Sequence, residues 1–226
     1  MKWSYLLALG LALVSTGCSV GSGAPVQPIP GSGDEILDQE YPVEDIGSAV
    51  GMVIKNYQFE SYVNPAIETG EDAQTLLSMG DFFNPTGDGV YGEDTPFEAG
   101  TKKPRALVIN AGAVWCGPCK EEAANELPKH FDELAPKGMQ LLFILFDSKK
   151  PGEAATFADL DNWTGAFDVR YPAGIDPKRH MADIGDPSQF PFNVIIDTRT
   201  MRIVEFVTGI PPASFWGQVE DVVEDE

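Results

Sequence analysis

The stretch that decides the fold runs from residue 106 to residue 127 and reads ALVINAGAVWCGPCKEEAANEL. Residues 106–111 form an apolar run of strand character, and residues 120–127 have the composition of a helix. Cys116 and Cys119 stand at the turn between the two segments. The sequence therefore predicts a strand that turns through a Cys-x-x-Cys pair into a helix.

This placement predicts different roles for the two sulfurs. Cys116 falls at the helix N-terminus, where unpaired backbone N–H groups and the helix dipole stabilise a thiolate, the nucleophile in disulfide exchange. Pro118 suits the first helical turn, because its missing N–H has no partner to lose there. Cys119 lies one turn deeper. We expect Cys116 to be the exposed attacking sulfur and Cys119 to be the shielded resolving sulfur.

Two other uses of a Cys-x-x-Cys pair are a structural disulfide and half of a zinc site. Zinc needs four ligands at matching spacing, and the sequence has no second Cys-x-x-Cys. His130 and His180 are isolated in the sequence, and we expect both at the surface. We therefore predict redox chemistry by the cysteines themselves, with no metal site and no cofactor.

The run from Trp115 to Lys120, WCGPCK, resembles the active site of thioredoxin. The surrounding chain is similar to the TlpA/ResA-like extracytoplasmic thiol–disulfide oxidoreductases of the thioredoxin superfamily. This resemblance covers roughly residues 47–224 and is most specific over 106–122 and 190–209. It implies an α/β thioredoxin fold, in which helices flank a central mixed β-sheet, with an N-terminal β extension.

Hydrophobic patterns and turn residues place the other elements of this fold. We predict strands at residues 53–59, 139–146, 171–176, 203–207 and directly after Pro191. We predict helices at 118–134 with a bend at Pro128, and at 152–167, 178–184 and 212–223. Residues 73–83 are expected to form a strand and a short helical turn before the first core strand.

The resemblance also implies which residues meet the substrate. Pro191 matches the superfamily's cis-proline, which faces the dithiol and lets the backbone of Phe190 pair with an extended substrate beside Cys116. The alternative for Pro191 is an ordinary trans proline at the start of a strand. Trp115 is expected to shield the dithiol and contact partners, or else to be an amphipathic aromatic at the rim of the domain.

Proton transfer is predicted to involve Glu122. Asn110 stands where thioredoxins carry a buried Asp, and an amide cannot titrate. TlpA/ResA-like proteins often combine that Asn with a Glu three residues after the second cysteine, which is the position of Glu122. Because residues i and i+3 share a helix face, Glu122 is expected near Cys119, where a partly buried carboxylate can exchange protons. The alternative is a solvated Glu in the first helical turn.

The charge excludes one class of partner, and the N-terminal sequence predicts export. The 226-residue chain has a formal net charge of −20, which argues against nucleic acid as a partner. Residues 1–17 combine a positive start with an apolar segment and read as a signal peptide. Cys18 follows small residues, as the lipidated cysteine of bacterial lipoproteins does, although Ser15 replaces the usual aliphatic residue. Ordinary cleavage, leaving Cys18 free or removing it, is the alternative.

Residues 18–46 are rich in Gly, Ser and Pro and read as a flexible tether, and residues 47–226 read as the thioredoxin-like domain. We therefore expect a protein of the bacterial cell envelope or periplasm, anchored to a membrane by lipid on Cys18. The predicted activity is reduction of disulfides in exported proteins, with re-reduction by a membrane electron donor. The alternatives are a peroxide-reducing redoxin and a copper chaperone that uses both cysteines, with His180 and Met181 as further ligand candidates.

Overall fold

The computed structural model describes residues 41–225, all within the compact unit Leu37–Glu226. The predicted signal peptide and Cys18 lie outside the described residues, as does most of the predicted tether. Tyr41, near the end of that tether, is buried, and its hydroxyl donates to the Ile54 carbonyl at 2.6 Å. The domain boundary at residue 47 stays a prediction. Among residues 41–225, no helix has the length and apolar character needed to cross a membrane.

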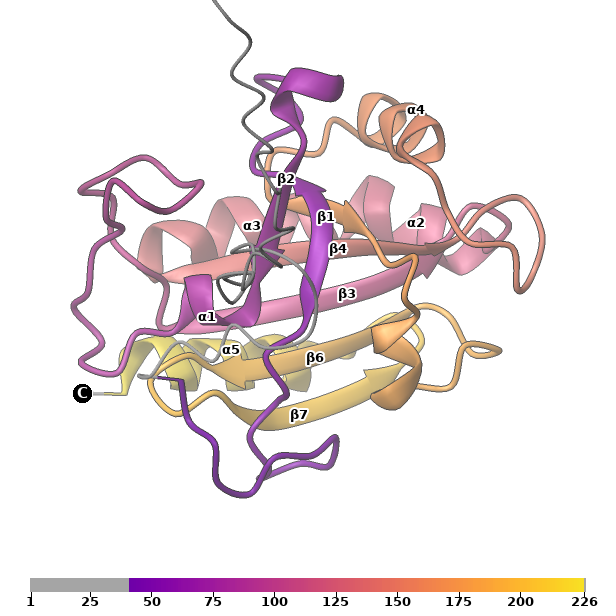
Figure 1. Cartoon of the computed structure of the whole chain (residues 1–226). Coiled ribbons are helices and arrows are strands. Elements are labelled where there is room, and N and C mark those ends of the chain that lie inside the picture. The colour runs from indigo at the N-terminus through magenta and orange to yellow at the C-terminus, as the bar shows by residue number, and fades with distance from the viewer. Residues whose placement is uncertain (1–40, 226) are drawn as a thin grey trace, which may run out of the picture. The chain divides into compact units, whose positions relative to one another are not determined.

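A mixed sheet organises the described residues (Figure 1), and its strand order is β2-β1-β5-β4-β3-β6-β7. β3 pairs in parallel with β4 and antiparallel with β6, while β4 pairs in parallel with β5. The strands are β1 (Gln58–Tyr62), β2 (Thr75–Ser78), β3 (Ala106–Ala113), β4 (Met139–Asp147), β5 (Ala173–Ile175), β6 (Phe192–Asp197) and β7 (Arg202–Thr208).

Helices connect these strands. They are α1 (Met79–Phe82), α2 (Gly117–Asn125), α3 (Leu127–Leu134), α4 (Phe157–Phe167) and α5 (Ala213–Glu224), with 3-10 turns η1 (Glu71–Ala73), η2 (Ala135–Lys137) and η3 (His180–Asp183). The central strands are buried along almost their whole length, because both faces of the sheet are covered, and most of their residues are apolar.

Alternate residues of β3 enter two separate cores. Val108 faces the core that contains both cysteines and the buried sides of α2, α3, α4 and α5. Leu107 faces the other core, which is closed by residues 41–83 and by Met181 of η3. The dithiol therefore belongs to the helix-covered face of the sheet.

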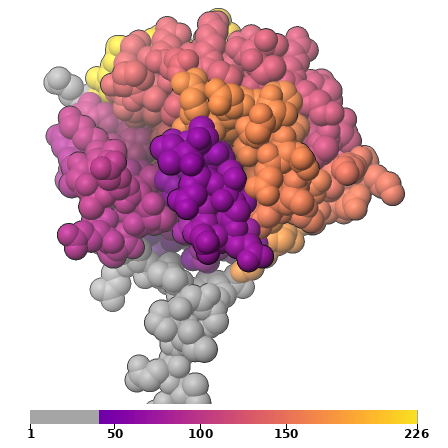
Figure 2. Space-filling view, turned by 90° about the horizontal axis from the view of Figure 1, so that it is seen from above, coloured from indigo at the N-terminus to yellow at the C-terminus, as the bar shows by residue number. Residues whose placement is uncertain are grey.

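The strands β1 and β2 join the sheet through β5. β1 runs antiparallel to β5, with Ser61 opposite Gly174. Figure 2 shows the purple surface of this early segment bordering the orange surface of the segment that follows β4. Gly174 has no side chain, which lets the backbone of β1 come close: a Cβ at Gly174 would lie 2.8 Å from the Glu60 carbonyl oxygen.

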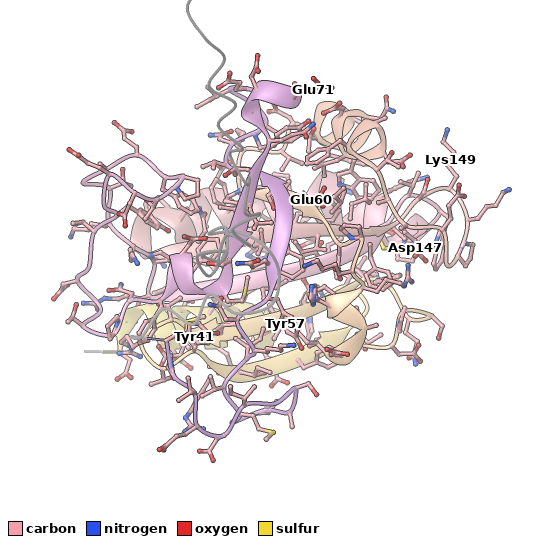
Figure 3. All side chains as sticks on the ribbon, viewed as in Figure 1. Tyr41, Tyr57, Glu60, Glu71, Asp147 and Lys149 are labelled. Carbon is pink, nitrogen blue, oxygen red and sulfur yellow. A yellow bond between two sulfur atoms is a disulfide. The ribbon has the colours of Figure 1, made fainter. Side chains whose placement is uncertain are left out.

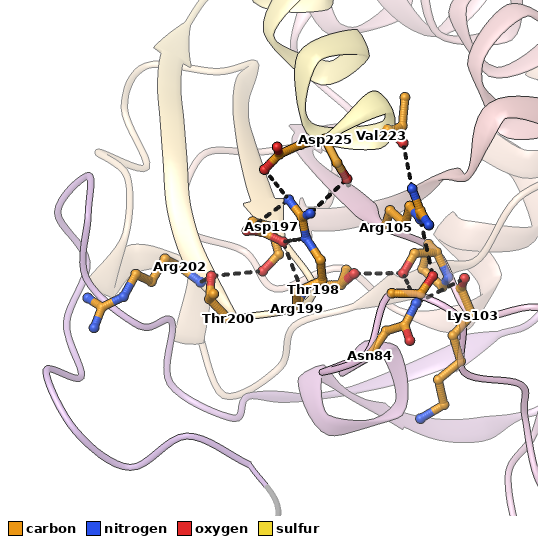
Figure 4. Close-up of polar contacts among 12 residues, drawn as sticks. Asn84, Lys103, Arg105, Asp197, Thr198, Arg199, Thr200, Arg202, Val223 and Asp225 are labelled. Atoms are coloured by element: carbon orange, nitrogen blue, oxygen red, sulfur yellow. Dashed lines mark hydrogen bonds and ion pairs between the residues drawn. The ribbon is translucent and has the colours of Figure 1, made fainter.

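The edge of the sheet where β3 begins is fixed by polar contacts (Figure 4). Thr198 donates through its hydroxyl to the Pro104 carbonyl at 2.6 Å, and Asn84 donates to the same carbonyl at 3.0 Å. Arg199 bonds both Asp197 and Asp225, which ties the β6–β7 turn to the end of α5. The dithiol lies at the other end of β3, so this network supports the frame and not the site.

Two predicted helices differ in the structure. The helix predicted over 118–134 is two helices, α2 and α3, separated at Glu126, because Pro128 in the first turn of α3 has no N–H to continue the ladder. The helix predicted from residue 152 begins at Phe157. Thr156 ends the preceding loop there by a capping box: its hydroxyl accepts from the Asp159 N–H, and the Asp159 carboxylate accepts from the Thr156 N–H.

The strand predicted at 53–59 is also displaced. β1 begins at Gln58, because the preceding residues pair with the β6–β7 turn instead. The Ile54 N–H donates to the Met201 carbonyl at 2.9 Å, and the Tyr57 N–H donates back to Lys55 at 2.7 Å. The remaining predicted elements are present: residues 73–83 contain β2 and α1, and residues 178–184 contain the 3-10 turn η3.

Substitution of Gly174 tests the packing of β1 on β5. Gly174→Ala should lower the free energy of unfolding by about 1–3 kcal/mol, because its Cβ would collide with the β1 backbone. The matched control is Gly165→Ala in α4, where a Cβ meets nothing within 4 Å. That change should raise stability by up to about 1 kcal/mol through helix propensity. Urea unfolding measures both variants, and equal stability of the two would contradict the packing described.

Candidate active site

The two cysteines form a disulfide at the start of α2. The S–S bond is 2.03 Å long, and the two Cα atoms are 5.3 Å apart. Cys116 is the N-cap residue, and its sulfur accepts a hydrogen bond from the Cys119 backbone N–H at 3.1 Å. The sulfur of Cys116 thus occupies the anion-stabilising end of the helix, as the sequence predicted.

The expected difference in exposure between the two sulfurs is wrong for this oxidised form. Cys116 is 2% exposed and Cys119 is 3% exposed. Both are buried because Trp115 and Phe190 pack against the core cluster that contains them. Position at the helix N-terminus, and not accessibility, therefore distinguishes the two sulfurs here.

The aromatic residues beside the dithiol meet across two segments. The Phe190–Pro191 peptide bond is cis, as the resemblance predicted. The rings of Trp115 and Phe190 lie edge to face with centroids 6.0 Å apart, and Phe146 lies 5.4 Å from Phe190. The structure thus brings Trp115, Phe190 and Pro191 together at one edge of the sheet.

Asp147, at the end of β4, joins the loops around this edge (Figure 3). One carboxylate oxygen accepts from both terminal nitrogens of Arg179 at 3.1 Å. The other accepts from the Trp115 indole N–H at 3.3 Å and from the Gly152 N–H at 2.9 Å. Arg179 also stacks on the Phe146 ring, 3.9 Å from its centroid. The buried Asp147 carboxylate thereby joins three neighbouring segments and orients the Trp115 ring.

Glu122 lies on the buried face of α2, and its side chain is fully removed from solvent. Its two carboxylate oxygens accept from different amides: the Asn110 side chain donates at 2.8 Å and the Asn193 side chain donates at 2.9 Å. Asn110 also donates to the Asn193 side-chain oxygen at 2.8 Å. The position of Glu122 on the buried face, three residues after Cys119, contradicts the alternative of a solvated Glu.

Burial raises the pKa of Glu122 to about 7, and the neighbouring Glu126 carboxylate adds to this rise. The hydrogen bonds donated by Asn110 and Asn193 act in the opposite direction, since they favour the ionised form. Glu122 can therefore both accept and release a proton near neutral pH, which is what a proton carrier requires.

Three residues of this site were missed by sequence reasoning. Asn193 interrupts the apolar run of β6, and that single polar position was the available signal. Asp147 ends an apolar strand, which many solvated residues also do. Arg179 has a left-handed backbone conformation, which the residues around it in the sequence do not predict.

The two histidines and Met181 do not lie where we expected. His130 is 12% exposed at its side chain and stacks on Trp216 at 4.0 Å, while His180 packs on Tyr57 at 5.1 Å. Both pack on aromatic rings and are partly buried, so neither is as exposed as we expected. Met181 is fully buried in the core on the other face of the sheet from the cysteines, so it cannot join them as a ligand.

Comparison with known proteins gives matches in structure alone. No protein-family model and no curated protein matches the chain. A secreted thiol-disulfide isomerase from Corynebacterium glutamicum superposes with a TM-score of 0.52 at 18% identity, over 77% of this chain and 86% of that one. A DsbF homologue from Corynebacterium diphtheriae gives 0.51 at 15% identity, over 75% and 85%. The reduced 2-Cys peroxiredoxin of Plasmodium vivax gives 0.54 at 14% identity, over 76% and 95%. The chain has the thioredoxin fold, with its cysteine pair at the N-terminus of α2.

Proposed function

We propose that the protein is an exported thiol–disulfide oxidoreductase that reduces disulfides in partner proteins through Cys116 and Cys119. The observation that carries this proposal is the disulfide at the N-terminus of α2, followed three residues after Cys119 by a buried carboxylate whose pKa is raised to about 7. A structural disulfide needs no such carboxylate. The similar C. glutamicum structure, a secreted thiol-disulfide isomerase, supports both export and dithiol chemistry.

The reaction begins with the reduced protein. The Cys116 thiolate attacks one sulfur of the substrate disulfide, and the other substrate sulfur leaves as a thiolate that takes up a proton. Cys119 then gives its proton to Glu122 and attacks the sulfur of Cys116. The mixed disulfide breaks, and the second substrate thiolate leaves and is protonated. Two electrons and two protons pass to the substrate, and a membrane electron donor restores the dithiol.

In this proposal the substrate lies along Phe190 and Pro191 beside Cys116. The backbone of Phe190 pairs with an extended segment of the substrate, while Trp115, fixed by Asp147, covers the sulfurs and contacts the partner. Lipid on Cys18 holds the protein at a membrane, where the electron donor is. The copper-chaperone alternative loses its proposed methionine ligand, because Met181 lies on the other face of the sheet.

Single-cysteine variants test the order of attack. Cys119→Ser should accumulate covalent complexes with an oxidised substrate such as insulin, because nothing remains to resolve the mixed disulfide. Cys116→Ser should trap little, since Cys119 lacks the helix N-terminal position. Non-reducing gel electrophoresis measures both, and wild-type protein should reduce insulin. Trapping by Cys116→Ser alone would invert the roles, and trapping by neither variant would argue against exchange.

Replacement of Glu122 tests proton transfer. Oxidation of the wild-type dithiol should accelerate as pH rises through about 7, where Glu122 ionises, and Glu122→Gln should lose that inflection. The same ionisation should lower the stability of the folded protein. The folded-state pKa of Glu122 lies above the unfolded value of 4.5, so the free energy of unfolding of wild type should fall by about 3 kcal/mol as pH rises through this range to about 7. Glu122→Gln should not show this fall.

The matched control for this experiment is Glu121→Gln, a change at an exposed position on the same helix. It should keep the wild-type profile for both rate and stability. A Glu122→Gln profile that coincides with wild type would show that Glu122 carries no proton for Cys119.

Membrane attachment is tested at Cys18. Cys18→Ala should move the protein from the membrane fraction to the soluble fraction, while Ser22→Ala in the predicted tether should not. Mass spectrometry of the wild-type protein should find an acylated N-terminal Cys18. An unmodified N-terminus at another residue would refute lipid anchoring.

A further inference from the structure

The two amides beneath Glu122 form a matched pair. Asn110 of β3 and Asn193 of β6 stand directly opposite each other in the antiparallel register, so both side chains project toward α2. Both are buried, and polar residues in the middle of two apolar strands are costly unless their hydrogen bonds are made. Here they are made to each other and to Glu122.

The carboxylate fixes the orientation of both amides. An ionised carboxylate only accepts hydrogen bonds, so each amide must turn its nitrogen toward Glu122. Asn193 is held in that orientation at its other end, because its oxygen accepts from Asn110 at 2.8 Å. Turning Asn193 over would place two nitrogen donors against each other. A protonated Glu122, by contrast, meets two donors and gains no acceptor from them.

We propose that Asn193 is a positioning residue for the dithiol reaction, whose amide holds the Glu122 carboxylate ready to accept the proton of Cys119. This inference rests on the proposed function, in which Cys119 loses its proton to Glu122. In that step the S–H bond of Cys119 breaks, an O–H bond forms on Glu122, and the sulfur is left as the thiolate that attacks Cys116. Asn193 itself contacts neither the substrate nor a bond that changes.

The groups around Glu122 explain why an amide is needed. Cys116 and Cys119 lie at the start of α2. Glu126, directly after α2, repels an ionised Glu122. Tyr171, just before β5, is buried and has its own pKa raised, mainly by burial and further by Glu122. None of these groups stabilises the carboxylate, and burial opposes its charge. The amides of β3 and β6 supply the opposing effect.

Asn193 differs from Asn110 by a second attachment. Its nitrogen also approaches the Gly209 carbonyl oxygen at 3.4 Å, and the Gly209 N–H donates to the Pro191 carbonyl at 2.7 Å. Asn193 is therefore fixed on one side by the carboxylate and on the other by the loop after β7.

The test uses two variants, Asn193→Leu and Asn193→Ala, in the full chain. The pH dependence of oxidation of the reduced protein by oxidised glutathione is measured for each. Both variants lose the donor, so the inflection should move upward by about one pH unit or more. Infrared titration of the protonated carboxyl should show the same shift directly in Asn193→Leu. The control is Asn125→Ala, an exposed amide on α2, which should leave the inflection in place.

A merely structural role would lower the rate equally at every pH and leave the inflection unmoved, which would overturn the inference. So would a shift that persists in the Glu122→Gln background, because Asn193 would then act through another group. If Asn193→Leu does not fold, Asn193→Ala decides the question, since it removes the donor without adding volume or charge. Insulin reduction by wild type is a separate readout: it can succeed while the inflection in the Asn193 variants stays unmoved, so the two proposals fail separately.

Discussion

The ionisation of one buried carboxylate is the constraint on which the site depends. The Glu122 side chain is fully buried, and the partners that the structure gives its two oxygens are neutral amides. Amide donors stabilise the ionised form less than a cation would, so burial outweighs the hydrogen bonds. The net effect raises the pKa of Glu122 to about 7, and the hydrogen bonds depend on β3 and β6 presenting Asn110 and Asn193 in register.

Asp147 is a second buried carboxylate, and its hydrogen-bond donors include a cation. A guanidinium, an indole N–H and a backbone N–H donate to it. A fully bonded ion pair of this kind fixes geometry, because breaking it leaves an uncompensated buried charge. The contacts of the two carboxylates differ accordingly: Asp147 binds Trp115 and the surrounding loops, while in our proposal Glu122 exchanges protons.

The sequence predicted the parts of the fold that local patterns determine. The dithiol turn, the apolar core strands and the short turn before β3 follow from composition and spacing. Element ends were predicted less well, because tertiary contacts decide them: Ile54 pairs with the β6–β7 turn instead of extending β1. In the site, Glu122 was predicted from the resemblance to TlpA/ResA-like proteins, with its spacing to Cys119 as support. Asn193 was not, because its partner Asn110 is 83 residues away and only the strand register brings them together.

In the proposed mechanism, proton transfer and substrate binding share one support, Gly209. Gly209 follows β7 with a φ of 85°, a left-handed conformation that glycine adopts without steric cost. In that conformation its N–H holds the carbonyl of Pro191, and its carbonyl receives the amide of Asn193. A substrate pressing on the Phe190–Pro191 segment therefore acts on the same residue that steadies the donor of Glu122. In our proposal, Gly209 therefore links the arrival of a partner to Glu122, the group that accepts the proton of Cys119.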